Sequence, residues 1–136
     1  MSGEAFQHGL IRLEAVADAV ERNALALDLA ETGRQEVLEP LVRLIGREDL
    51  RNSRGTLVHA LGNLDCSRHV AFLAGLVATG NYEVAHEALY ILEGVVAEPS
   101  DDIDRAVSIT EAALASTGLE DWRRELLEEL TECYED

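Results

Sequence analysis

The chain has 136 residues and a formal charge of −16 at pH 7, and all 11 of its basic residues are arginines. A field of this sign repels nucleic acids, which excludes them as partners bound through their phosphates and favours a cationic protein partner. Hydrophobic residues make up 47% of the chain but aromatic residues only 4%, so we expect an aliphatic core of packed helices.

The N-terminal segment, residues 1–34, is predicted to form two capping helices. Apolar side chains recur at steps of three and four from Phe6 to Leu27, which is the period of a helix that is buried along one face. We expect a break near Asn23 and an end at Gly33. One long helix is the alternative.

Residues 35–65 and 66–97 are predicted to be two copies of one repeat. Each copy has two apolar-periodic stretches separated by a short polar turn, which is typical of a helical hairpin. A glycine near the end of each copy's second helix is expected to suit a left-handed backbone. Shifting the sequence by 32 residues places matching residues over one another: Leu41 over Leu73, Leu57 over Leu89, and Gly62 over Gly94.

The C-terminal segment, residues 100–136, is predicted to form a capping hairpin. Ser100 is a favourable N-cap for a helix that runs to about Thr117. A last helix follows Gly118 and places Trp122 on its apolar face. The dipole of the first of these helices is complemented by three carboxylates: Asp101, Asp102 and Asp104.

Together these elements predict an all-α protein, a short right-handed α-solenoid of about four stacked helical hairpins in a single domain, residues 1–136. The longest uncharged stretches, such as VAFLAGLVATG, are far shorter than the roughly 20 residues that span a bilayer. The first residues lack the pattern of an export signal, and Cys66 and Cys133 lack CxxC spacing. We therefore expect a cytoplasmic protein with reduced thiols and no membrane contact, present as a monomer or weak homodimer.

The repeat resembles that of the HEAT and HEAT-like family, whose second helix commonly reads Val-Arg, then Ala, and ends in Ala-Leu-Gly. The segment SRGTLVHALGNL supplies Arg54 and the ending Ala-Leu-Gly at residues 60–62, with Ser53 in place of Val. The second copy has His86 where the family has Arg. The resemblance covers about residues 36–96 and implies stacked helical hairpins whose inner helices bind a protein partner.

Two histidines lie where catalytic or metal chemistry has to be considered. Cys66 and His69 in DCSRH have the spacing of a nucleophile and a base at a helix start, but no third group orients the histidine. In HEALY, His86 begins the zinc-protease motif, but Tyr90 stands where that motif needs its second histidine. We therefore expect a structural Cys66, no metal, no cofactor and no enzymatic activity.

Three arginines, Arg43, Arg47 and Arg51, form the centre of the chain's basic concentration. In an acidic helical protein we expect them to pair with neighbouring carboxylates, with a binding interface as the alternative. Trp122 also has two open interpretations. Tryptophan is enriched in interface hot spots, but a position on an apolar helix face favours the core.

These patterns favour a non-enzymatic protein-binding module, although an acidic surface can also serve solubility alone. The family resemblance implies an immunity protein that neutralises a basic bacterial toxin by direct binding, so a toxin domain is the first candidate partner. The alternatives are an adaptor or scaffold subunit of a larger complex, and a HEAT-like lyase or regulatory subunit of an enzyme. The candidate partner-binding residues are His59, Asn63, His86, Glu87, Tyr90, Glu93 and Trp122.

Overall fold

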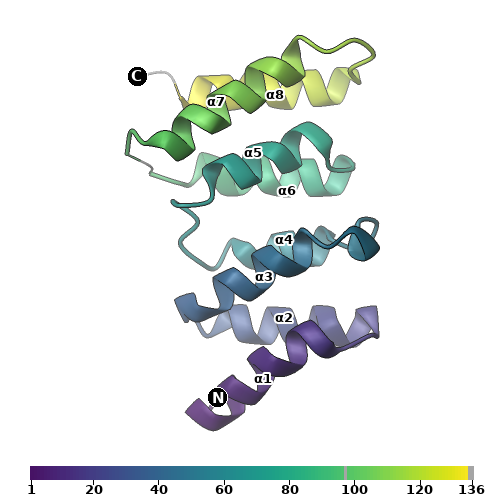
Figure 1. Cartoon of the computed structure of the whole chain (residues 1–136), viewed down its shortest axis with the longest axis vertical. Helices are drawn as coiled ribbons and strands as arrows, with labels where there is room; N and C mark the ends of the chain where they lie inside the picture. Colours follow the sequence, from purple (N-terminus) through teal and green to yellow (C-terminus); the bar gives the residue numbers. More distant parts are fainter. Residues whose placement is uncertain (97, 135–136) are drawn as a thin grey trace. The chain divides into compact units, whose positions relative to one another are not determined.

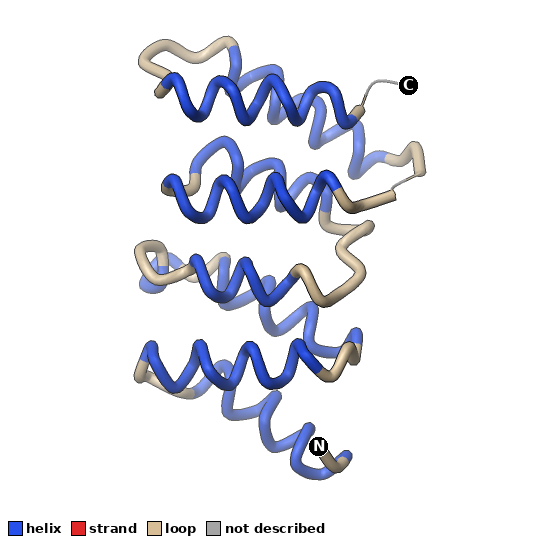
Figure 2. The backbone as a smooth tube through the Cα atoms, turned by 180° about the vertical axis from the view of Figure 1, so that it is seen from behind, coloured by secondary structure: helices blue, strands red, loops and turns tan. Residues whose placement is uncertain are grey.

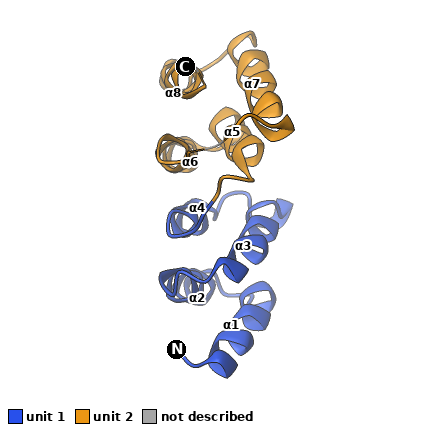
Figure 3. Ribbon diagram, turned by 90° about the vertical axis from the view of Figure 1, so that its left-hand side faces the viewer, with its two compact units in different colours: residues 1–65 blue, residues 66–136 orange. Residues whose placement is uncertain are grey.

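The computed structural model describes residues 1–96 and 98–134. Within these residues the regular elements are helices joined by short loops (Figure 2), which confirms the predicted all-α class. The chain divides into two compact units, Met1–Asp65 and Cys66–Asp136 (Figure 3). Residues 97 and 136, which end two of the predicted segments, lie outside the described residues, as does residue 135.

The first unit contains two pairs of packed helices (Figure 1). In one pair α1 (Gly3–Ala15) packs on α2 (Ala19–Glu31), and in the other α3 (Leu38–Ile45) packs on α4 (Gly55–Leu61). The pairs meet through α1 with α3 and through α2 with α4. Short 3-10 helices at Gln35–Val37 and Glu48–Leu50 precede and follow α3. The core shared by the two helix pairs consists of fully buried side chains: Phe6, Leu13, Leu29, Leu41, Leu44, Ile45 and Leu57.

The break in the N-terminal segment lies at residues 16–18, so the prediction of a break near Asn23 was wrong. Asp18 caps α2 by accepting a 2.9 Å hydrogen bond from the backbone N–H of Glu21. Arg22, only 4% exposed, donates to the carbonyl oxygens of Val16 and Ala17 and so satisfies the loop before the helix. A local cap and a buried cation therefore fix the break five residues before the expected position.

The second unit contains α5 (Val70–Thr79), α6 (Tyr82–Glu93), α7 (Asp101–Leu114) and α8 (Asp121–Cys133). Here α5 packs on α6 and α7 on α8, while α5 also packs on α7 and α6 on α8 (Figure 1). The expected short turn between α5 and α6 is present. Asn81 caps α6 by accepting a 2.9 Å hydrogen bond from the Val84 N–H. The predicted N-cap at Ser100 is confirmed, because its hydroxyl accepts from the N–H of Ile103.

The helix ends differ from the predictions in two respects. The helix that begins after Ser100 ends at Leu114, three residues before the expected Thr117. Gly62 and Gly94 do end α4 and α6, but their φ angles are −61° and −92°, so neither is left-handed. The glycines with positive φ are those at two other helix junctions, Gly33 at 71° and Gly118 at 74°.

Asp102 caps a helix other than its own. Its carboxylate, on α7, accepts hydrogen bonds from the backbone N–H groups of Val70 at 2.8 Å and Ala71 at 3.3 Å, the first two residues of α5. The first N–H groups of a helix have no partner inside it, so this contact satisfies α5 and joins the two packed helices. Among the described helices, none is both long and apolar enough to cross a bilayer.

Candidate protein-binding surface

Three rings from α6 and α8 meet in one cluster on the second unit. The ring centroids of Tyr82 and His86 are 4.0 Å apart, and those of Tyr82 and Trp122 are 5.1 Å apart in an edge-to-face arrangement. The rings of His86 and Trp122 are stacked at 5.9 Å. Tyr82 is 60% exposed and the other two rings are half-buried. The packing of α6 on α8 therefore places a large aromatic surface in contact with solvent.

Local helix geometry positions two of these rings. Tyr82 and His86 are one helical turn apart on α6, so their side chains lie on the same face. The Nδ1 atom of His86 lies 2.7 Å from the carbonyl oxygen of Tyr82. A carbonyl oxygen only accepts, so Nδ1 is the donor and carries the hydrogen. This bond fixes the orientation of the imidazole, and in the neutral ring Nε2 remains an acceptor.

Trp122 is held in place by the arginine that follows it. The guanidinium carbon of Arg123 lies 4.5 Å from the centre of the Trp122 ring, within the range of a cation–π contact. The same guanidinium bonds both carboxylate oxygens of Glu120, at 2.9 and 3.0 Å, which lowers the pKa of Glu120 from 4.5 to about 2. Trp122 is thus half-buried beside a fixed cation, and its indole is part of the surface as well as of the packing.

Exposed carboxylates lie along both of the helices that carry the aromatic cluster. Burial raises the pKa of the Cys133 thiol, and so do the nearby charges of Glu93, Glu129 and Glu132. These charges therefore gather near the end of α6 and of α8, away from the rings at the start of each helix. The exposed carboxylates on the two helices are Glu83, Glu93, Asp121, Glu125, Glu128, Glu129 and Glu132.

The structure brings together two of the predicted site residues, His86 and Trp122, and adds Tyr82 to them. The spacing Tyr82–His86–Tyr90, with one residue per turn, is a sequence signal that could have identified Tyr82. Tyr90 is 76% exposed, one turn beyond His86 on α6. On the same helix, Glu87 is half-buried and Glu93 is exposed.

The other two predicted residues belong to the first unit. His59 is exposed on α4. Asn63 is exposed just after α4, and its side-chain amide donates to the carbonyl oxygen of Ala60 at 3.4 Å. The α6–α8 surface is therefore the part of the predicted site that lies on the second unit.

The structure also places the other residues that the sequence analysis considered for chemistry. Cys66 is 2% exposed, and the backbone N–H of His69 donates to its carbonyl oxygen. Nowhere in residues 1–96 and 98–134 do three His, Cys, Asp or Glu side chains gather as a metal site requires. Each of three arginines forms an ion pair: Arg43 with Glu14 of α1, Arg47 with Asp49, and Arg51 with Glu48.

No protein-family model, curated protein or solved structure matches the chain.

Proposed function

We propose that this protein is a non-enzymatic binding module whose α6–α8 surface takes up a cationic protein, with a basic bacterial toxin as the first candidate. The observation that carries the proposal is the partly exposed cluster of Tyr82, His86 and Trp122 on two helices that also carry exposed carboxylates. Aromatic side chains of this kind dominate the binding energy of protein interfaces. The negative charge of these two helices favours a partner that brings lysines or arginines.

The two parts of this surface are expected to affect different steps of binding. The net charge of −16 acts at long range and steers a cationic partner toward the protein. It is screened beyond about 8 Å at physiological salt, so it determines the association rate more than the final affinity. The aromatic rings act only on contact, so they are expected to set the dissociation rate.

A kinetic experiment tests this division of roles. The product of the gene adjacent to this one, as the candidate toxin, is immobilised, and binding of the full chain is followed by surface plasmon resonance at about 50 and 500 mM salt. We expect the association rate to fall about tenfold or more at the higher salt. We expect Tyr82→Ala to raise the dissociation rate, with a cost of about 1–3 kcal/mol. The dissociation rate of Tyr90→Ala tests in the same way whether the contact with the partner extends along α6.

A pair of charge variants provides the matched control. Glu87→Lys with Glu93→Lys changes four units of charge on α6, and Glu31→Lys with Glu36→Lys makes the same change on the first unit. Both double variants reduce the long-range field equally, so only the first should also accelerate dissociation. Equal dissociation rates for wild type, Tyr82→Ala and the α6 double variant would contradict the proposal.

We also propose that the helix pairs continue through the chain as the short right-handed α-solenoid that the HEAT-like resemblance implies. Support comes from within each unit, where the first helices of successive pairs pack on each other and the second helices do the same. NMR relaxation of the full chain should then give one rotational correlation time for both units. Two independent correlation times would contradict a continuous solenoid.

A further inference from the structure

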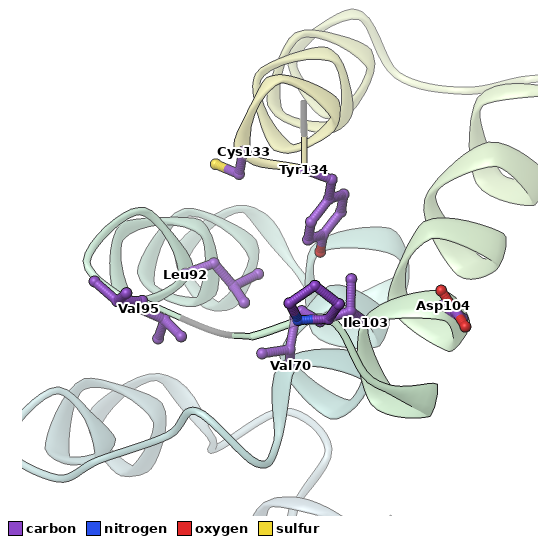
Figure 4. Close-up of a pocket in the computed structure, with 9 residues that line it drawn as sticks. Val70, Leu92, Val95, Ile103, Asp104, Cys133 and Tyr134 are labelled. Carbon is purple, nitrogen blue, oxygen red and sulfur yellow. The ribbon is translucent and has the colours of Figure 1, made fainter. Parts of the chain in front are cut away.

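A pocket of about 360 Å³ lies in the second unit where the ends of several helices meet. Its apolar walls include Val70 at the start of α5, Leu92 near the end of α6, Val95 just after it, and Ile103 on α7 (Figure 4). Small-molecule pockets typically have volumes of about 300–1,000 Å³ and mostly apolar walls with a few polar groups. A dry cavity of about 150 Å³ holds one benzene molecule, so this pocket has room for one ring with substituents.

One polar group in the pocket, the Tyr134 hydroxyl, has no hydrogen-bond partner among residues 1–96 and 98–134. Tyr134, at the end of α8, reaches into the pocket with its hydroxyl directed toward the apolar walls (Figure 4). The hydroxyl oxygen is buried and makes no hydrogen bond to any residue that the structure describes. Burial raises the pKa of Tyr134 to about 12, and the neighbouring Thr110 moderates this rise without reaching hydrogen-bond geometry. The phenol therefore keeps its proton and can donate to a bound acceptor.

The charges around the pocket determine which ligands it can accept. Asp104 lines the pocket. The charge of Asp102 contributes to the raised pKa of Tyr134, and that of Glu93 to the raised pKa of the Cys133 thiol, which is also in the lining. An anion would meet this negative field without a cation to offset it among the lining residues that the structure describes. An uncharged ligand avoids that cost and still uses the apolar walls.

We propose that this pocket is a binding site for a small uncharged molecule, made of an apolar ring or short chain and one carbonyl-type acceptor that receives the Tyr134 hydroxyl. A buried donor without a partner costs free energy in the empty pocket, and a ligand acceptor removes that cost. The apolar part of the molecule fills the space between Val70, Leu92 and Ile103. This site is separate from the Tyr82–His86–Trp122 cluster, which involves none of the pocket's lining residues.

Two probes of nearly the same shape test the role of the hydroxyl. Acetophenone has a carbonyl group where ethylbenzene has a methylene, and neither carries charge. Each is titrated into the full-length protein, and the dissociation constant is obtained from NMR shifts of the backbone amides of Val70, Val95 and Ile103. We expect both probes to bind saturably. Tyr134→Phe should weaken acetophenone about 2- to 12-fold and leave ethylbenzene unchanged.

The stability of the same variant separates a ligand role from a structural one. Tyr134→Phe removes a buried unpaired hydroxyl, so its melting temperature without ligand should equal or exceed that of wild type. Benzoate, a similar ring with a negative charge, should bind more weakly than acetophenone to wild type. Val95→Trp should fill the pocket and abolish binding of both neutral probes. The matched control, Val20→Trp on the first unit, where Val20 is 77% exposed, should not affect binding.

The proposal is overturned if neither neutral probe shifts the pocket amides of wild type. It is also overturned if Tyr134→Phe weakens both probes equally, because the hydroxyl would then have no specific acceptor. If the Val95→Trp variant bound the neutral probes as tightly as the Val20→Trp variant does, the probes would be binding elsewhere on the protein.

Discussion

Arg123 on α8 donates a 2.9 Å hydrogen bond from Nη1 to the carbonyl oxygen of Val77, 46 residues earlier in α5. The side chain of Arg123 is almost completely buried, and its other nitrogens bind Glu120. One guanidinium therefore satisfies a carbonyl near the end of α5, fixes the start of α8 and supports the ring of Trp122. The aromatic surface depends on this buried cation for its position.

Replacing Arg123 with methionine should destabilise the protein strongly. The substitution keeps an apolar chain of similar reach but removes the bonds to Val77 and Glu120, and a buried carbonyl without its charged donor costs about 2–4 kcal/mol. Chemical denaturation measures the change. The adjacent Arg124 is exposed, so Arg124→Met is the matched control and should change stability by less than about 0.5 kcal/mol. Equal losses of unfolding free energy in Arg123→Met and Arg124→Met would contradict the stabilising role of the buried Arg123.

The pair formed by Glu120 and Arg123 should also make stability depend on pH. The pKa of Glu120 falls from 4.5 to about 2 in the folded protein, so the folded state favours the ionised carboxylate. Its contribution is fully present above about pH 4.5 and is lost as pH falls toward 2. Below pH 4.5, the stability of wild type should therefore decrease relative to that of Glu120→Gln, as measured by thermal melting at a series of pH values.

A double variant provides the control for this pH effect. In the Arg123→Met background the carboxylate has lost its cation, so adding Glu120→Gln should no longer change the pH profile. A difference between the pH profiles of Arg123→Met and of this double variant would mean that a group other than Arg123 lowers the pKa of Glu120.

Asp102→Ala should destabilise α5 although Asp102 lies on α7. The variant leaves the N–H groups of Val70 and Ala71 without their acceptor, and loss of an N-terminal cap costs about 0.5–2 kcal/mol. Asp102→Asn keeps an oxygen acceptor and should lose less. Asp101→Ala changes the neighbouring exposed carboxylate and serves as the control. Hydrogen exchange should show faster opening at the start of α5 in Asp102→Ala, and unchanged exchange there would contradict the cap.

Leu57 and Leu89, which occupy matching positions in the two predicted repeats, should contribute similarly to the stability of their units. Leu57 is completely buried in the first unit and Leu89 is 3% exposed in the second. Truncating either to alanine leaves a cavity and should cost about 2–5 kcal/mol in the free energy of unfolding. Val20, which is 77% exposed, provides the control, because Val20→Ala removes an apolar side chain that is not in the core. A Leu89→Ala protein that melts like wild type would contradict the predicted core.

The amino-acid sequence alone determined the class of the fold and most of its helices. Apolar residues at steps of three and four predicted Leu57 and Leu89 as core positions, and both are buried. The cap at Ser100 was also predictable, because capping needs only a side chain and an N–H group three residues away. The break at Asp18 was missed because it depends on Arg22 as well, whose burial is not visible in a local pattern.

Only the tertiary structure decided which side chains from distant segments meet. From the sequence, Asp102 is assigned only to the dipole of its own helix, but the contact between α5 and α7 makes it also the cap of α5. His86 and Trp122 were predicted separately, and the packing of α6 on α8 joined them with Tyr82. The pocket around Tyr134 likewise exists only where four helices meet. The physical reason is that helical periodicity determines which face of a helix is buried, whereas the neighbour on that face depends on how whole helices pack.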